Sequence, residues 1–207
     1  MKLAEAHKIA HSLGDASKMP GKTYGLPAKE CGVGGRLRNV ENSVCFGCYA
    51  LKGRYIMENV QMAEYIRLDS ITHPLWVDAM SVQINHYCKR VPFFRWHDSG
   101  DIQNLEHLQK IIQVVKRTPS VKHWLPTREY KIVKLYRDLY GAFPSNLVVR
   151  LSGHMIDEPP PSGYGLPTST VVSDHSETCP SRQQGNECGD CRDCWDVDIV
   201  NVSYAKH

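Results

Sequence analysis

The spacing of apolar residues in the first half of the chain predicts helices. Residues 54–70 carry apolar side chains three and four positions apart, and residues 74–90 continue the same pattern. The apolar positions of the first segment are Ile56, Val60, Ala63 and Ile66. We therefore expect two consecutive helices before residue 91.

From Val91 onward, a unit of short apolar run, polar loop and helical segment recurs. Residues 91–101 and 104–117 form the first unit, and residues 121–129 and 130–141 form the second. Further short apolar runs occupy residues 146–157, 169–175 and 197–207. Repetition of strand, loop and helix predicts an α/β fold whose parallel strands are joined by right-handed crossovers. The last run predicts an edge strand.

Polar side chains follow each of these predicted strands. They are His97, Asp98 and Asp101 after the first, Thr127, Arg128 and Glu129 after the second, Ser152 and His154 after the third, and Asp174 and His175 after the fourth. The carboxyl ends of parallel strands form the binding site in barrels and in open sheets, so these residues are site candidates. Alternatively they are turn and cap residues, a role that Ser99 and Asp101 would suit.

Length and composition predict one domain. The chain has 207 residues, of which 42% are hydrophobic, and this is enough for a single core. We divide residues 1–207 into an N-terminal cysteine motif with helices (1–90), a repeated strand and helix core (91–175) and a cysteine-rich tail (176–207). Residues 1–22 resemble neither a signal peptide nor a membrane span, so we expect a cytoplasmic protein without membrane association.

The charge is small but uneven. The net charge is +3, and Lys and Arg outnumber the acids up to about residue 155, after which Asp and Glu dominate. A mildly basic body suits an anionic cofactor or nucleic acid as a partner.

Four of the eight cysteines lie in the tail, and in a reducing cytoplasm clustered cysteines favour metal binding over disulfides. Cys188, Cys191 and Cys194 form CxxCxxC, and Cys179 precedes a proline. Bacterial ferredoxins use these elements to hold a [4Fe-4S] cluster, whereas zinc sites more often pair two separated knuckles. We favour the cluster and keep zinc as the alternative. Acidic residues around the tail predict a lowered reduction potential.

The other cysteine group, near the start of the chain, offers three thiols, from Cys31, Cys45 and Cys48. Three thiolates on a cubane leave one iron open to a substrate or cofactor, whereas a closed four-cysteine site suits structure or electron transfer. A mixed site built from both groups is a further alternative. Cys88 stands alone in a predicted helix and reads as a small buried apolar residue.

Five motifs together resemble the bacteriophage "gene product eighty-eight" family, whose members are similar to short radical S-adenosylmethionine enzymes. The motifs are VCFGCYALKGRY, FRWHDSGD, LPTRE, LSGH and the tail CP…CGDCRDCW. The resemblance implies a phage-encoded iron-sulfur protein in the cytoplasm of the infected host cell. It also implies an incomplete TIM-barrel-like parallel sheet with a cysteine-rich C-terminal appendage. The cysteine spacing departs from the CxxxCxxC of radical enzymes, because Cys31 lies fourteen positions before Cys45.

Two functions follow as hypotheses. In the first, the protein is an iron-sulfur enzyme that has an open iron, an unknown small-molecule substrate or electron donor, and S-adenosylmethionine as a further cofactor. The residues that would position the substrate or move protons are His97, Asp98, Arg128, His154 and His175, and those that would hold the cofactor are Arg95, Ser99, Asp101 and Arg150. In the second, the chain is a non-catalytic electron carrier or structural metalloprotein, or a zinc-stapled module that binds nucleic acid.

Overall fold

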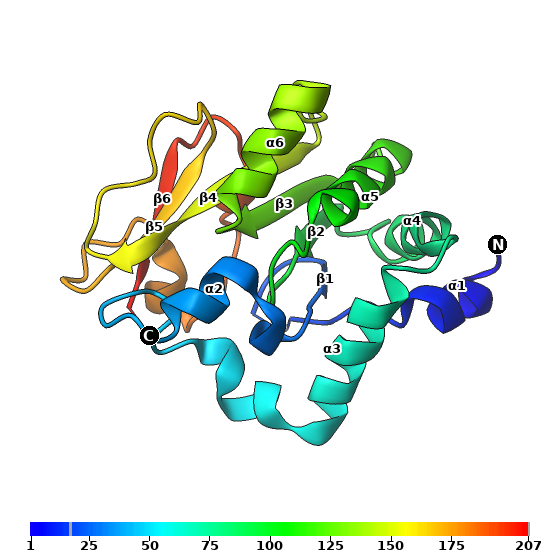
Figure 1. The fold of residues 1–207 in the computed structure, drawn as a ribbon, viewed down its shortest axis with the longest axis horizontal. Helices are drawn as coiled ribbons and strands as arrows, with labels where there is room; N and C mark the ends of the chain where they lie inside the picture. The colour runs from blue at the N-terminus through cyan, green and yellow to red at the C-terminus, as the bar shows by residue number, and fades with distance from the viewer. Residues whose placement is uncertain (17, 207) are drawn as a thin grey trace.

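A six-stranded parallel sheet organises the chain in this computed structural model, which describes residues 1–16 and 18–206. The strands are β1 (Lys22–Tyr24), β2 (Phe93–Trp96), β3 (Lys122–Thr127), β4 (Leu147–Ile156), β5 (Thr168–Val172) and β6 (Asn201–Ala205). They neighbour one another in chain order, and each neighbouring pair is parallel. The predicted parallel α/β fold is thereby confirmed. β1 and β6 form two free ends, so the sheet is open (Figure 1).

Helices precede and connect the first four strands. They are α1 (Leu3–Ala10), α2 (Gly32–Leu37), α3 (Glu58–Ser70), α4 (Trp76–Tyr87), α5 (Leu105–Arg117) and α6 (Tyr130–Tyr140). Short 3-10 turns are η1 (Ala28–Glu30), η2 (Tyr49–Leu51), η3 (Gly53–Ile56), η4 (Pro180–Gln184) and η5 (Asp193–Trp195). The helices expected after Val91 form at the expected places. The predicted final strand appears as β6, and His207 at its expected end lies outside the described residues.

The main core lies between the sheet and helices α4, α5 and α6, which cover one face of it (Figure 1). The sequence of helix α5 explains why a helix forms here and which of its faces packs against the sheet. Asn104 caps it, since its side chain accepts a hydrogen bond from the His107 backbone N–H at 2.8 Å. Leu108, Ile111 and Val115 then recur at helical spacing and are fully buried.

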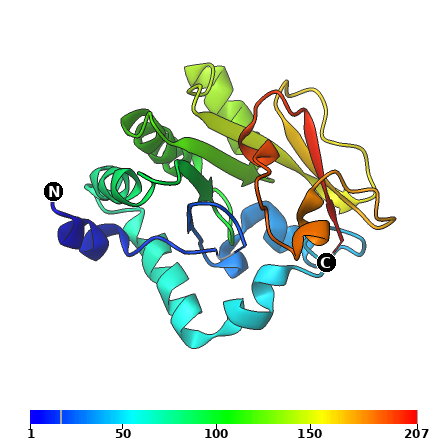
Figure 2. The same ribbon diagram turned by 180° about the vertical axis from the view of Figure 1, so that it is seen from behind.

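The opposite face of the sheet is covered by the cysteine-rich tail (Figure 2). Trp195 packs against Trp124 of β3 and donates a hydrogen bond from its indole N–H to the Phe94 carbonyl at 3.0 Å. Arg150 of β4 is fully buried and donates to the carbonyls of Thr168, Ile199, Asp193 and Asp196. The tail that we expected as an appendage therefore contributes to a second core, because Trp195 and the Arg150 bonds fix it to β3 and β4.

Helix α3 departs from the predicted pattern. The spacing correctly predicts a helix, but its apolar positions do not form the buried face. Ile56 and Ile66 are exposed, whereas Glu64 and Arg67 are buried. Arg67 reaches the Ser12 carbonyl at 3.0 Å, so α3 is held to the rest of the chain partly by polar contacts. Burial here follows these contacts and not the apolar period.

The buried carboxyl of Glu64 predicts a pH-dependent stability. Burial raises its pKa from the ordinary value of 4.5 to about 7. Between these pH values the folded state binds more protons than the unfolded state, so the free energy of unfolding falls as pH rises through this window. We expect Glu64→Gln to flatten that fall and to stabilise the protein at pH 8, as measured by urea unfolding at pH 5, 6.5 and 8. Glu58→Gln, at an exposed position of the same helix, should leave the fall in place; a wild-type stability independent of pH would contradict the prediction.

Candidate functional site

The N-terminal cysteine motif lies at the carboxyl edge of the sheet, where the arrowheads of β3 and β4 point toward it in Figure 1. The backbone beside Cys45 pairs with the end of β4. Val44 donates to the His154 carbonyl at 2.9 Å, and Ile156 donates to the Asn42 carbonyl at 2.9 Å. These bonds place Cys45 next to the polar residues that follow the strands.

Cys31 and Cys45 approach each other across Gly34 of α2. A Cβ atom at position 34 would lie 3.1 Å from the Cys31 Cβ and 3.5 Å from the Cys45 Sγ, so a larger residue would crowd both thiols. Burial, together with the neighbouring Asp101, Cys48 and Cys45, raises the pKa of Cys31 to about 12. The three predicted thiols therefore lie within electrostatic range of one another.

Asp101 anchors the polar surroundings of these thiols. Its carboxylate accepts hydrogen bonds from the Ile102 backbone N–H at 2.7 Å, the Thr127 hydroxyl at 2.6 Å and the Arg128 backbone N–H at 2.9 Å. Burial nevertheless raises its pKa to about 6. The Asp101 side chain joins the ends of β2 and β3 and lies within electrostatic range of Cys31 and Cys45.

Glu129 fixes the turn that carries Cys31. Its Oε1 atom accepts a hydrogen bond from the Val33 backbone N–H at 2.6 Å. A Cβ atom at Gly32 would lie 2.9 Å from the same oxygen, so glycine is needed for this close approach. The end of β3 therefore sets the position of the first cysteine.

Arg128 and His154 line the same edge. The Arg128 side chain donates to the Gly153 carbonyl at 3.2 Å, and its charge opposes the rise in the pKa of Cys45 that burial causes. The His154 ring stacks on Tyr130 with ring centres 4.5 Å apart. Arg128 thus places a positive charge beside these thiols, where a guanidinium can bind an anionic group of a substrate or cofactor.

His97 and Asp98 are neighbours in the sequence, but their side chains have different partners. His97 is buried, its Nδ1 lies 3.1 Å from the Tyr24 carbonyl, and burial lowers its pKa to about 4. Asp98 accepts a hydrogen bond from Tyr55 at 3.2 Å through its side chain and from Tyr49 at 2.5 Å through its carbonyl. Tyr49 follows Cys48 directly, so Asp98 connects β2 to the thiol motif.

Other candidates lie away from the three thiols. His175 is exposed after β5 and contacts Arg182 of the tail. Asp174 is exposed and accepts hydrogen bonds from Ser176. Ser152 is buried and accepts a hydrogen bond from the Ser169 hydroxyl at 3.1 Å, and Ser99 is buried at the end of β2. None of these contacts tests the roles predicted for them.

The tail cysteines form a separate group on the covered face of the sheet. Cys179 lies within electrostatic range of Cys188, Cys191 and Cys194. Burial raises the pKa of Cys194 to about 12, and its Sγ lies 3.1 Å from the Tyr204 hydroxyl. The predicted assignment of these four cysteines to one metal site stays a prediction.

Two arginines, the half-buried Arg95 and the fully buried Arg150, face this second group. Arg95 lies over the Trp124 ring at 4.5 Å and is within electrostatic range of Cys188 and Cys194, and Arg150 is within range of Cys194. In the part of the chain that the structure describes, neither forms an ion pair with a carboxylate. Each also has a buried Nε without a hydrogen-bond partner. The tail group is thus lined by two cations whose neighbouring carboxylates, Asp98 for Arg95 and Asp193 and Asp196 for Arg150, lie within electrostatic range but beyond ion-pair distance.

Sequence reasoning missed several residues around these thiols. Tyr49 contacts Arg95 at 3.5 Å, and Tyr204 contacts Cys194, so both tyrosines lie against the cysteine groups. The sequence does offer a signal for Tyr49, because this residue directly follows Cys48. Tyr204 had no such signal, because β6 brings it to the tail from ten positions farther along the chain.

The eight cysteines are free thiols. Among residues 1–16 and 18–206, no three or more His, Cys, Asp or Glu side chains form a ready-made group for a metal ion. Within the same residues, no helix combines the length and apolar character needed to span a membrane.

The comparisons with known proteins place the chain in one family. Neither the curated proteins nor the solved structures include a match. The family model described as gene product 88 matches residues 2–197, so the chain belongs to the gene product 88 family.

Proposed function

We propose that the protein binds iron-sulfur clusters at its two cysteine groups. Cys31, Cys45 and Cys48 would hold a [4Fe-4S] cluster with one open iron, and Cys179, Cys188, Cys191 and Cys194 would hold a second, closed one. The observation that carries the proposal is that the thiols of each group lie within electrostatic range of one another and of an arginine, with Cys45 and Cys194 buried.

The residues fit an anionic metal group. Negative charge beside a buried guanidinium is stabilising, because the low-dielectric surroundings strengthen the attraction. Arg95 and Arg150 lie within electrostatic range of the tail thiols, so metal-bound thiolates of Cys188 and Cys194 would be stabilised by these cations. With pKa values raised by burial, these thiols are neutral until a metal displaces their protons. Zinc bound by four thiolates would be stabilised in the same way and is the alternative for the tail.

When bound, a cluster with an open iron supplies one-electron chemistry or a coordination position at the carboxyl edge. Arg128 would bind an anionic group of the substrate or cofactor there, and Asp101 would hold or release a proton, since its pKa is about 6. His154, stacked on Tyr130, would orient the bound molecule. Arg150 is a poorer candidate for binding S-adenosylmethionine, because its terminal N–H groups already donate to carbonyls.

The architecture supports a resemblance to radical enzymes. Parallel strands in chain order 1 to 6 are the order expected of an incomplete barrel, although the sheet is open. The thiol motif also lies at the carboxyl edge, where such folds carry their sites. S-adenosylmethionine remains a proposed cofactor, with Ser99, Asp101 and Arg95 as proposed contacts, and the infected cell's cytoplasm remains the proposed location.

Anaerobic purification followed by quantification of iron, acid-labile sulfide and zinc tests the proposal. We expect about eight iron atoms and as many sulfides per chain for two [4Fe-4S] clusters. Colourless protein with stoichiometric zinc and no iron would overturn it. Adding S-adenosylmethionine to the reduced protein should change the electron paramagnetic resonance spectrum of the open cluster; an unchanged spectrum would leave the cluster proposal intact and reject this cofactor.

The second candidate is a non-catalytic electron carrier or structural protein. It is favoured by the burial of Cys194 against the sheet, in the same hydrophobic cluster as Trp124 and Trp195. A closed cluster in such a place suits electron transfer or stability more than substrate binding. Iron at the tail alone, with none at Cys31, Cys45 and Cys48, would favour this candidate over the enzyme.

Arg95→Gln is expected to lower the reduction potential of the tail cluster. The buried guanidinium lies near Cys188 and Cys194, and its positive charge favours the added electron. Loss of that charge should lower the potential by on the order of 50 mV, since about 1.4 kcal/mol corresponds to roughly 59 mV for one electron. Redox titration followed by electron paramagnetic resonance measures the change.

Arg192→Gln is the matched control for this substitution. Arg192 also lies near Cys188, but its guanidinium donates to the Gly189 carbonyl at an exposed turn, whereas the Nε atom of Arg95 is buried. Solvent therefore screens the Arg192 charge more, and its removal should shift the potential less. Equal shifts for the two variants would contradict a special role of the buried Arg95.

A further inference from the structure

The loops that enter β2 and β3 are basic and contain no acid. Residues 88–92 contribute Lys89 and Arg90, and residues 116–122 contribute Lys116, Arg117 and Lys122. These five side chains are exposed. The loops at the other ends of the same strands carry Asp98, Asp101 and Glu129, so the two edges of the sheet differ in charge.

The topology brings these cations to one place. β1, β2 and β3 are adjacent and parallel, and their amino ends are in register, with Lys22 opposite Phe94 and Phe93 opposite Lys122. Since neighbouring strands lie about 4.8 Å apart, the three entries span roughly 10 Å. We call the exposed surface of Lys89, Arg90, Lys116 and Lys122 the amino-edge surface.

Acids neutralise only the margins of this surface. Asp15 pairs with Lys22 at 2.8 Å, and Asp78 pairs with Arg117. The four cations of the amino-edge surface form no ion pair with any described carboxylate. Their charge therefore faces solvent.

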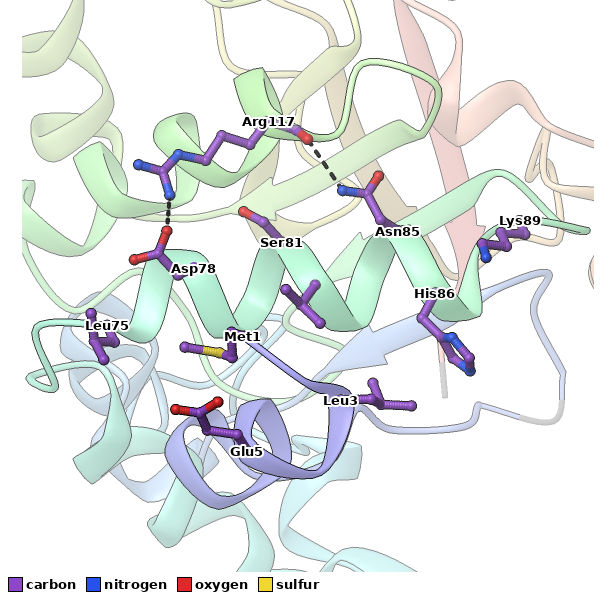
Figure 3. A pocket seen from close by; sticks show the side chains of 11 residues that line it. Met1, Leu3, Glu5, Leu75, Asp78, Ser81, Asn85, His86, Lys89 and Arg117 are labelled. Atoms are coloured by element: carbon purple, nitrogen blue, oxygen red, sulfur yellow. Dashed lines mark hydrogen bonds and ion pairs between the residues drawn. The ribbon is translucent and has the colours of Figure 1, made fainter.

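A cavity of about 850 Å³ adjoins the surface, between α1 and α4. Figure 3 shows Lys89 and His86 at one end of it, with the Arg117 and Asp78 pair at the other. Glu5 is the acid in this hollow without a charged partner among the described side chains. The hollow itself is thus mixed in charge, and the cations stand at its rim.

An aromatic pair, the exposed Tyr87 and the half-buried His7, lies near these cations. The rings of Tyr87 and His7 stack with centres 5.8 Å apart, and Tyr87 precedes Lys89 by two positions. Lys22 lies 5.8 Å from the centre of the Tyr87 ring. Unpaired cations next to exposed rings suit a chain of phosphates that carries stacking bases.

We propose that the amino-edge surface binds the phosphate backbone of nucleic acid. Charge complementarity carries this proposal, because four unpaired cations on a short edge match phosphates better than they match a neutral or cationic partner. Lysine and arginine contacts to phosphates carry no information about the bases, so the binding is independent of sequence. The proposal does not depend on metal at either cysteine group.

Fluorescence anisotropy with short labelled single-stranded and duplex DNA tests it on the full chain. The slope of log affinity against log salt should be about −3 to −4, as expected when four phosphates are neutralised. The variant K89Q/R90Q/K116Q/K122Q should bind at least tenfold more weakly and lose most of this slope. The variant K52Q/R54Q/K131Q/K134Q removes four exposed charges elsewhere and should bind like the wild type.

Two outcomes would overturn the proposal. One is the absence of salt-dependent binding by the wild-type protein. The other is equal weakening by the two quadruple variants, because that would reflect net charge alone. Circular dichroism of each variant separates a loss of binding from a loss of folding. If the quadruple variant misfolds, the double variants K89Q/R90Q and K116Q/K122Q replace it. Each double variant is expected to remove about half of the salt slope.

Discussion

Cys45→Ala is expected to lower the iron content of the anaerobically reconstituted protein by about four atoms per chain. Cys45 is buried at the carboxyl edge and shares the space beside Gly34 with Cys31. With only three thiols in this group, removal of one leaves two ligands, which are too few to retain a cubane. Iron and sulfide analysis measures the loss, and the four tail thiols should keep the remaining iron.

Cys88→Ala is the matched control for this loss. Cys88 is also buried, but it lies at the end of α4 and its Sγ is 3.7 Å from the Phe93 carbonyl, away from both cysteine groups. It should retain all of the iron while losing some stability, since a buried side chain is shortened. Equal iron in Cys45→Ala and Cys88→Ala would contradict a cluster at the N-terminal group.

The periodicity after Val91 was sufficient to predict the parallel core, because each unit there is locally consistent. In α5, apolar spacing coincides with the buried face, so local pattern and tertiary packing agree. β1 was not predicted, since Lys22–Tyr24 is only three residues long and its pairing with β2 crosses a long insertion. A strand this short has no period to detect.

Helix α3 shows where apolar spacing fails. Its buried positions are Glu64 and Arg67, and these are satisfied by contacts with residues distant in the sequence. A sequence pattern carries no information about such partners. The same limit applies to Arg150, which occupies an ordinary strand position but binds carbonyls of the tail.

The spacing along the chain predicts two groups of cysteines, and within each group the structure places the thiols within electrostatic range of one another. What spacing could not reveal is the cationic lining of the tail group by Arg95 and Arg150, since β2 and β4 supply these side chains from the sheet. Acidic neighbours in the sequence predicted a lowered potential, whereas these buried arginines act in the opposite direction. The net effect of these charges on the reduction potential therefore depends on the fold.

Arg150→Met is expected to lower the free energy of unfolding of the metal-free protein by about 3–5 kcal/mol, because four buried carbonyls lose charged donors. Methionine has a similar length and keeps the apolar contacts, so the change isolates the hydrogen bonds. Urea unfolding monitored by tryptophan fluorescence measures the loss, and limited proteolysis should cut residues 179–195 first as they detach from β4.

Arg137→Met provides the comparison for Arg150, because Arg137 also donates to a carbonyl, that of Tyr164, but from the partly exposed surface of α6. Its loss should reduce stability by about 1 kcal/mol, since water replaces the missing donor there. If the two variants unfold alike and the tail resists proteolysis in both, Arg150 does not hold the tail to the sheet. A large loss at Arg150 alone would mean that the cysteine-rich tail folds as part of the sheet before any metal is bound.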